Sequence, residues 1–151
     1  GLTVLERGWL SANNIVFAAQ PGDREGAAVV DTGYVAHSEQ TLALVADTLQ
    51  GQPLARILNT HLHSDHCGGN AALQAAYPQV QTWIAPGQAD DVRSWNEAAL
   101  SYAPTGQDCP RFSITGVLQP GTTVQLSGRG WRSAWAARAS AGAATATRRS
   151  R

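Results

Sequence analysis

Short hydrophobic runs separated by tight turns fill the first 30 residues of the chain. Residues 2–10 (LTVLERGWL), 15–19 (IVFAA) and 26–30 (GAAVV) are apolar and β-branched enough to form strands. Asn13-Asn14 and Pro21-Gly22-Asp23 lie between these runs and are typical of turns. The pattern therefore predicts a β-meander of three short strands.

The hydrophobic period then changes from that of a strand to that of a helix. Leu42, Val45 and Leu49 recur at a spacing that places them on one helical face. Gly51 and Pro53 follow and end the predicted helix.

Strands and helices are predicted to alternate through the rest of the chain. Further strands are predicted at residues 54–58, 80–85, 112–118 and 122–126, further helices at 71–77 and around 92–99, and a loop at 101–110. Asn70 is a candidate N-cap for the helix that Pro78 ends. Strands followed by alternating helices and strands predict a sheet packed against helices, in the α/β (α+β) class.

The residues with the clearest chemistry follow the strand predicted at 54–58. Residues 60–70 read THLHSDHCGGN, and they contain three of the four histidines of the chain. Imidazole and carboxylate groups are ligands that suit Zn²⁺ and related divalent ions. In an extended segment His61 and His63 point the same way and could hold one ion, while Asp65 and His66 could face a second position. Gly68-Gly69 would let the backbone turn and approach the site.

The pattern His61-x-His63-x-Asp65-His66, followed by Gly68-Gly69, resembles the signature of the metallo-β-lactamase superfamily. The order of the preceding elements, including the strand that ends at Asp31-Thr32-Gly33, is also similar to that family. The resemblance covers roughly residues 2–131, and the histidine motif is its specific part.

The resemblance implies the N-terminal half of a four-layer αβ/βα sandwich. It implies that His61 and His63 bind a first metal, that Asp65 and His66 bind a second, and that Asp31 supports the ligand loop. The cofactor implied is Zn²⁺, two ions in the complete family site, with iron or manganese as alternatives because these ligand types accept several ions. A water activated by the metals would attack an ester, thioester, lactone or lactam in a small-molecule substrate, and Asp65 would help to orient that water. A glyoxalase II-like thioesterase and a lactonase are equal expectations.

The chain departs from this family pattern after the histidine motif. The family needs further ligands from its second half, and no histidine follows His66. A catalytic zinc usually takes three protein ligands, so two histidines are too few for a complete first site. The alternative to an active hydrolase is therefore a truncated, inactive remnant that binds metal weakly or not at all. Half of a sandwich would also leave an apolar sheet face uncovered and favour association.

Charge is divided unevenly along the 151 residues. The net charge is zero, with eleven basic residues against eleven acidic ones. Five arginines and no acid fall in residues 132–151, so residues 1–131 carry a formal charge of −5. This negative body disfavours a nucleic-acid partner, which would need cations facing phosphate. No run of 18 apolar residues predicts a membrane span.

The composition of residues 132–151 sets them apart from a domain at 1–131. This Ala/Arg/Ser/Thr stretch is predicted to be disordered or translated out of frame, with a genuine basic tail as the competing interpretation. Two cysteines, and no secretory signal, favour a reducing compartment and a cytoplasmic location.

Three other residues are weighed as candidates for metal binding or for the substrate cleft. His37 is expected to be a solvated or capping residue, and Cys67 to be small packing at a turn. Trp9 could belong to the core or to a wall of the substrate cleft. The oligomeric state does not follow from the sequence.

Overall fold

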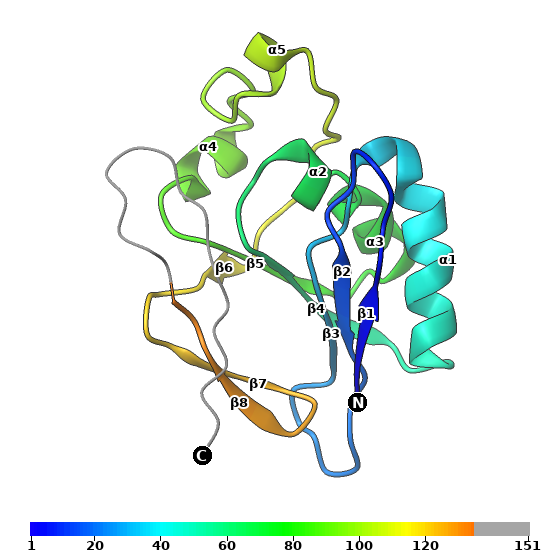
Figure 1. Cartoon of the computed structure of the whole chain (residues 1–151). Helices are drawn as coiled ribbons and strands as arrows, with labels where there is room; N and C mark the ends of the chain where they lie inside the picture. Colours follow the sequence, from blue (N-terminus) through cyan, green and yellow to red (C-terminus); the bar gives the residue numbers. More distant parts are fainter. Residues whose placement is uncertain (135–151) are drawn as a thin grey trace.

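The computed structural model describes residues 1–134, whose elements are labelled in Figure 1. Strands β1 (Leu2–Leu5), β2 (Asn14–Phe17) and β3 (Ala27–Val30) form the predicted antiparallel meander. β1 ends well before the predicted end at residue 10. The Arg7 guanidinium donates to the side chains of Asn14 at 2.6 Å and Thr41 at 2.7 Å, and these contacts draw the chain away from the sheet.

The second part of the sheet is parallel. The strand order is β1-β2-β3-β4-β5-β6, and β4 (Leu54–Asn59), β5 (Gln81–Ile84) and β6 (Gly116–Val117) continue from β3 in parallel. Parallel neighbours need crossover connections. A 3₁₀ turn (Val35–His37) and helix α1 (Ser38–Leu49) connect β3 to β4. Helices α2 (Ser64–Cys67) and α3 (Asn70–Ala76) connect β4 to β5.

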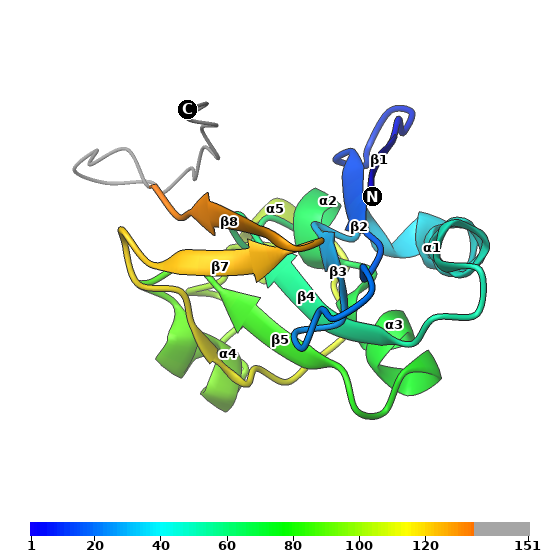
Figure 2. The same ribbon diagram turned by 90° about the horizontal axis from the view of Figure 1, so that it is seen from below.

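Helices α1 and α3 cover one face of this sheet, and a hairpin packs on the other, as Figures 1 and 2 show. Val45 and Leu49 of α1 and Leu73 of α3 are buried against apolar residues of β2, β3 and β4. The hairpin consists of β7 (Thr123–Leu126) and β8 (Arg129–Arg132), joined through Ser127 and Gly128, which both have positive φ. Its residues Leu126 and Trp131 contact Phe17 and Leu58 on the opposite face of the sheet.

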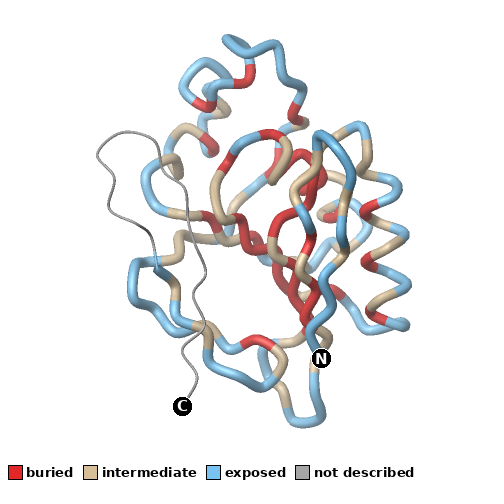
Figure 3. The backbone as a smooth tube through the Cα atoms, in the orientation of Figure 1, coloured by how far each residue is buried: buried red, intermediate tan, exposed pale blue. Residues whose placement is uncertain are grey.

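Burial is concentrated along the central strands and the start of the β4–β5 connection (Figure 3). A separate cluster joins that connection to helices α4 (Ala89–Ser94) and α5 (Tyr102–Thr105). Its buried members are Leu62, Cys67, Ile84, Val92, Leu100, Tyr102, Cys109 and Phe112. The segment between β5 and β6 is thereby fixed against the loop that carries the histidines.

Several boundaries differ from those predicted. The helix expected to reach residue 99 ends at Ser94, because Trp95 takes a left-handed conformation with φ 54°. Residues 101–110, predicted as loop, contain α5. The strand predicted at 112–118 is reduced to two residues, Gly116 and Val117. β8 was not predicted, because Arg129 and Gly130 interrupt any hydrophobic alternation.

The α/β class predicted from the sequence is confirmed. The hairpin covers part of the sheet face that the sequence analysis expected to be bare, since Phe17 and Trp131 pack edge to face with ring centroids 5.3 Å apart. Most of the predicted tail, residues 135–151, lies outside the described residues, and Arg132 is the last residue of β8. Within residues 1–134, no helix has the length and apolar character to cross a bilayer.

Candidate metal centre

The histidine motif begins where two parallel strands end side by side. Asp31 follows β3 and Thr60 follows β4, and the Asp31 amide donates to the carbonyl of Leu58 at 2.9 Å. The carboxyl ends of parallel strands are a common place for functional side chains in α/β folds. The predicted placement of the motif directly after a strand is therefore what the structure shows.

Asp31 is buried at the bottom of this site and forms its structural base. It is 5 % exposed, and its carboxylate accepts hydrogen bonds from the backbone N–H and the hydroxyl of Thr60, at 2.9 and 2.7 Å. The same carboxylate lies 2.8 Å from Nδ1 of His66. Asp31 also takes a left-handed conformation, with φ 56°, which aspartate tolerates better than most residues. One side chain thus ties the start of the motif to its last histidine.

The four predicted ligands lie together above this base. The ring centroid of His61 is 4.6 Å from that of His63 and 3.8 Å from that of His66. Oδ2 of Asp65 lies 3.4 Å from Nε2 of His66. His63 is exposed, and the other three are half-buried, so the group faces solvent on one side.

The two half-buried histidines at the centre of the site have opposite tendencies to bind protons. Burial lowers the pKa of His61, and the neighbouring His66 and His63 lower it further. Burial also opposes the charge on His66, but the hydrogen bond that His66 donates to Asp31 and the charges of Asp31 and Asp65 outweigh it and raise its pKa. His61 therefore loses its proton at a lower pH than His66 does.

A set of buried polar side chains, which the sequence analysis did not identify, holds the backbone of the motif. The carbonyl of His66 accepts from the Thr32 amide at 2.7 Å and from Nδ2 of Asn59 at 3.3 Å. Asn70 donates to Oδ1 of Asn59 at 2.7 Å and accepts from the Thr32 hydroxyl at 2.8 Å. Thr32, Asn59 and Asn70 are all at most 2 % exposed.

Asn70 corrects one expectation from the sequence. It is the first residue of α3 rather than its N-cap, which is Gly69, and its amide is used in the buried network. The signal that could have revealed this network is Asn59, a polar residue directly after the apolar run of β4.

The two glycines are needed for close packing of the backbone and not for a turn with positive φ. Gly68 and Gly69 have ordinary negative φ values of −61° and −83°. A Cβ on Gly68 would lie 2.5 Å from the backbone nitrogen of Val35, and one on Gly69 would lie 2.5 Å from the carbonyl oxygen of Thr32. These distances are too short for any side chain, so both glycines are required for the motif to lie against the segment after β3.

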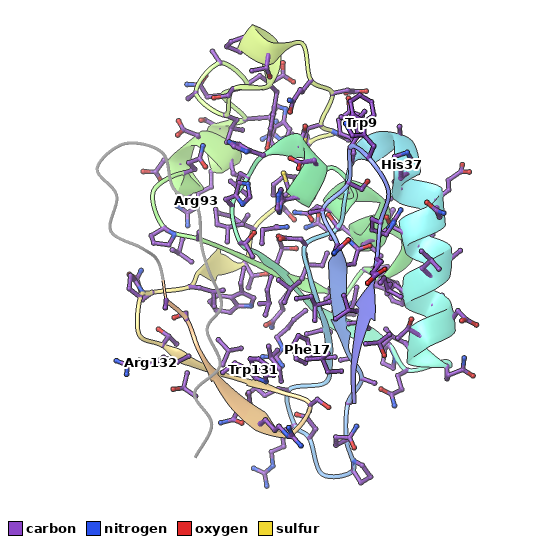
Figure 4. All side chains as sticks on the ribbon, in the orientation of Figure 1. Trp9, Phe17, His37, Arg93, Trp131 and Arg132 are labelled. Carbon is purple, nitrogen blue, oxygen red and sulfur yellow. The ribbon has the colours of Figure 1, made fainter. Side chains whose placement is uncertain are left out.

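The remaining candidates lie outside the donor group. His37 occupies the N-cap position of α1, although its side chain makes no capping hydrogen bond, and its Nδ1 lies 2.8 Å from the Ser11 hydroxyl. Cys67 is fully buried, as expected for a packing residue. Trp9 is 86 % exposed in the loop after β1, which excludes a core role, and Figure 4 labels its side chain on that loop.

The donor chemistry of this group fits a divalent metal, with one limit. Imidazole and carboxylate are appropriate ligands, and a histidine whose second nitrogen is held by a buried carboxylate is a common arrangement at metal sites. Among residues 1–134, however, no three His, Cys, Asp or Glu side chains are arranged around one ion position. The described residues thus supply donors for part of a site.

The comparison with known families agrees with this geometry. The sequence model of the metallo-beta-lactamase superfamily matches residues 7–131. The chain belongs to the metallo-beta-lactamase superfamily. The matched residues include all four predicted donors and Asp31.

Curated relatives and solved structures extend the comparison. The chain is 33 % identical over 118 residues to a hydroxyacylglutathione hydrolase of Gloeobacter violaceus, covering 74 % of this chain and 41 % of the relative. It is 39 % identical over 72 residues to a hydroxyacylglutathione hydrolase of Synechocystis, covering 48 % of this chain and 26 % of that protein. The chain thus spans less than half the length of these relatives.

Metallo-beta-lactamase structures share the fold. One from Cronobacter sakazakii superposes with a TM-score of 0.67 at 20 % identity, covering 89 % of this chain and 49 % of that one. The FEZ-1 enzyme from Legionella gormanii gives a TM-score of 0.65 at 14 % identity, covering 81 % of this chain and 45 % of that one. At these identities the likeness shows the fold alone. The fold of this chain corresponds to about half of each structure.

Proposed function

We propose that this chain carries the N-terminal metal ligands of a hydrolase that acts on a small-molecule carbonyl substrate. In this proposal His61 and His63 serve a first divalent ion, and Asp65 and His66 serve a second. Zinc is the proposed metal, with iron or manganese as alternatives. The observation that carries the proposal is the gathering of these four side chains above the carboxylate of Asp31.

The residues of the chain have distinct proposed roles in this chemistry. Divalent ions held by such donors lower the pKa of water and polarise a substrate carbonyl. The Asp31 carboxylate accepts a hydrogen bond from the Nδ1–H of His66, which leaves Nε2 of that ring free as a ligand atom. The Asp65 carboxylate is 42 % exposed, so it can both reach an ion and accept a proton from an attacking water.

A thioester is the substrate class that the curated relatives favour. Those relatives are named hydroxyacylglutathione hydrolases, and an acyl group joined to the thiol of glutathione is a thioester. A lactone remains the second choice, because the same attack on a carbonyl would open it. The formal charge of −5 on residues 1–131 makes a nucleic-acid substrate unfavourable.

The test combines metal content with turnover of matched substrates. The chain would be loaded with zinc, desalted and analysed for bound metal, then assayed with an acyl-glutathione thioester, a lactone and a β-lactam. The proposal predicts bound zinc and faster hydrolysis of the thioester than of the lactam. His63→Ala should remove most of the bound zinc while changing the free energy of unfolding by less than about 0.5 kcal/mol, because His63 is exposed. His37→Ala is the matched control and should retain the zinc.

An inactive, weakly metal-binding chain is the alternative, and one observation favours it. Within the described part of the chain no three donors surround one ion position. This alternative predicts less than one zinc per chain and no hydrolysis of any of the three substrates. Zinc content that is the same in His63→Ala and His37→Ala would contradict the ligand assignment itself.

A further inference from the structure

The two cysteines of the chain are brought together beside the histidine motif. Cys67 ends α2, and Cys109 lies in the segment between α5 and β6. Their sulfur atoms are 3.8 Å apart, although the residues are separated by 42 positions in the sequence. They are 0 % and 5 % exposed, respectively. Nothing in the sequence pattern indicated this pairing, which joins the metal loop to a distant segment.

The two segments are already held in place around the sulfur atoms. The Tyr102 hydroxyl donates to the carbonyl of Leu62 at 2.9 Å and lies 3.2 Å from the sulfur of Cys67. The Ser64 hydroxyl donates to the side-chain oxygen of Gln107, so a second contact joins the same segments. A disulfide needs sulfur atoms about 2.0 Å apart, so an approach of roughly 2 Å is required.

We propose that Cys67 and Cys109 are a disulfide site, which closes within one chain when the protein meets a low-molecular-weight disulfide such as oxidised glutathione. The bond would covalently join α2 of the metal loop to the segment after α5. This inference does not depend on the hydrolase activity.

The reaction balances as two thiol–disulfide exchanges. The Cys109 thiolate attacks the oxidant disulfide, which forms a mixed disulfide and releases one thiol. The sulfur of Cys67 then attacks the sulfur of Cys109, which releases the second thiol. The oxidant gains the two electrons and two protons that the cysteine pair loses.

The surroundings of the pair indicate the order of these exchanges. Cys109 is 5 % exposed and Cys67 is 0 % exposed, so Cys109 is the one that the oxidant would meet first. The hydrogen bond from Cys67 lowers the pKa of the Cys109 thiol, although burial opposes this change. Cys67 is fully buried in contact with Cys109, so it is placed to resolve the mixed disulfide rather than to react with another chain.

Peptide mapping provides a sharp test, because arginines separate the two cysteines. Trypsin cleavage after Arg56, Arg93 and Arg111 places Cys67 in peptide 57–93 and Cys109 in peptide 94–111. The full chain would be reduced, stripped of metal, exposed to oxidised glutathione under native conditions, alkylated in denaturant and digested without reductant. The expected result is loss of both free thiols and recovery of the two peptides as one species that separates on reduction. The melting temperature should rise by about 5 °C on oxidation, reversibly.

Matched variants and isotope mixing make the result decisive. Cys109→Ala should retain the Cys67 thiol unmodified and show no reversible change in melting temperature with oxidant. Oxidation of a mixture of ¹⁴N- and ¹⁵N-labelled chains should give linked peptides of one isotope only. Two free thiols after oxidation, a glutathione adduct as the end product, or linked peptides of mixed isotope would each overturn the proposal.

Discussion

The base and the rim of the candidate metal centre are built in different ways. The base consists of Asp31, Thr32, Asn59 and Asn70, which are nearly inaccessible and bonded to one another or to the motif backbone. The rim consists of His61, His63, Asp65 and His66, which are exposed or half-buried. A buried polar group that loses its hydrogen-bond partner lowers the stability of the fold, whereas an exposed group can form a hydrogen bond with water instead. Folding therefore depends on the base, and the proposed metal binding depends on both.

Removal of the Asp31 carboxylate should produce the largest effect. Asp31→Ala leaves the Thr60 amide and the His66 ring without their acceptor in a partly buried place. We expect the free energy of unfolding, measured with urea, to fall by about 2–4 kcal/mol, with loss of bound zinc. Asp31→Asn keeps the shape and one acceptor oxygen, so it should lose less stability. An unchanged urea midpoint in Asp31→Ala would show that the base does not hold the loop.

A smaller loss is expected from the other side of the base. Asn70→Ala removes the side-chain donor to Oδ1 of Asn59 and the acceptor of the hydrogen bond from the Thr32 hydroxyl. The expected decrease in the free energy of unfolding is roughly 1–3 kcal/mol, again measured with urea. Asn96→Ala is the control, because Asn96 is exposed and its side chain makes a single weak contact of 3.2 Å with the Ala99 amide. Equal losses in the two variants would show that the buried contacts of Asn70 contribute no more to stability than the exposed contact of Asn96.

The sequence predicted the rim far better than the base. His61, His63, Asp65 and His66 form a compact local motif, so residue type and spacing were enough to bring them together. Asp31 was expected only through the resemblance to a family. The contacts of Asn59 and Asn70 depend on the packing of α3 against the ends of β3 and β4, which no local pattern encodes.

The same distinction explains which elements of the fold were predicted. Helix α1 is predictable because Val45 and Leu49 repeat at helical spacing. The structure buries both residues against the sheet. The end of β1 is set by contacts of Arg7 with distant residues, and β8 is held by pairing with β7 and by Trp131. These features depend on tertiary contacts rather than on hydrophobic period, and so they were missed.

The smallest expected effect is a difference in pKa between His66, whose ring is hydrogen-bonded to Asp31, and the neighbouring His61. In the metal-free chain, titration followed by NMR should give His66 a pKa above the ordinary value of about 6.5 and His61 a pKa below it. The raised pKa of His66 contributes stability that is present below about pH 6.5 and is lost as the pH rises through the folded-state pKa. The lowered pKa of His61 acts in the opposite sense, since stability rises as the pH increases through the interval between its folded-state pKa and about 6.5.

Asp31→Asn should lower the pKa of His66 because the hydrogen-bonded charge is removed, and His61 should shift less because Asp31 contributes little to its pKa. If both histidines shifted equally in Asp31→Asn, the carboxylate would act as a diffuse charge on the whole rim, and its specific support of His66 would be rejected.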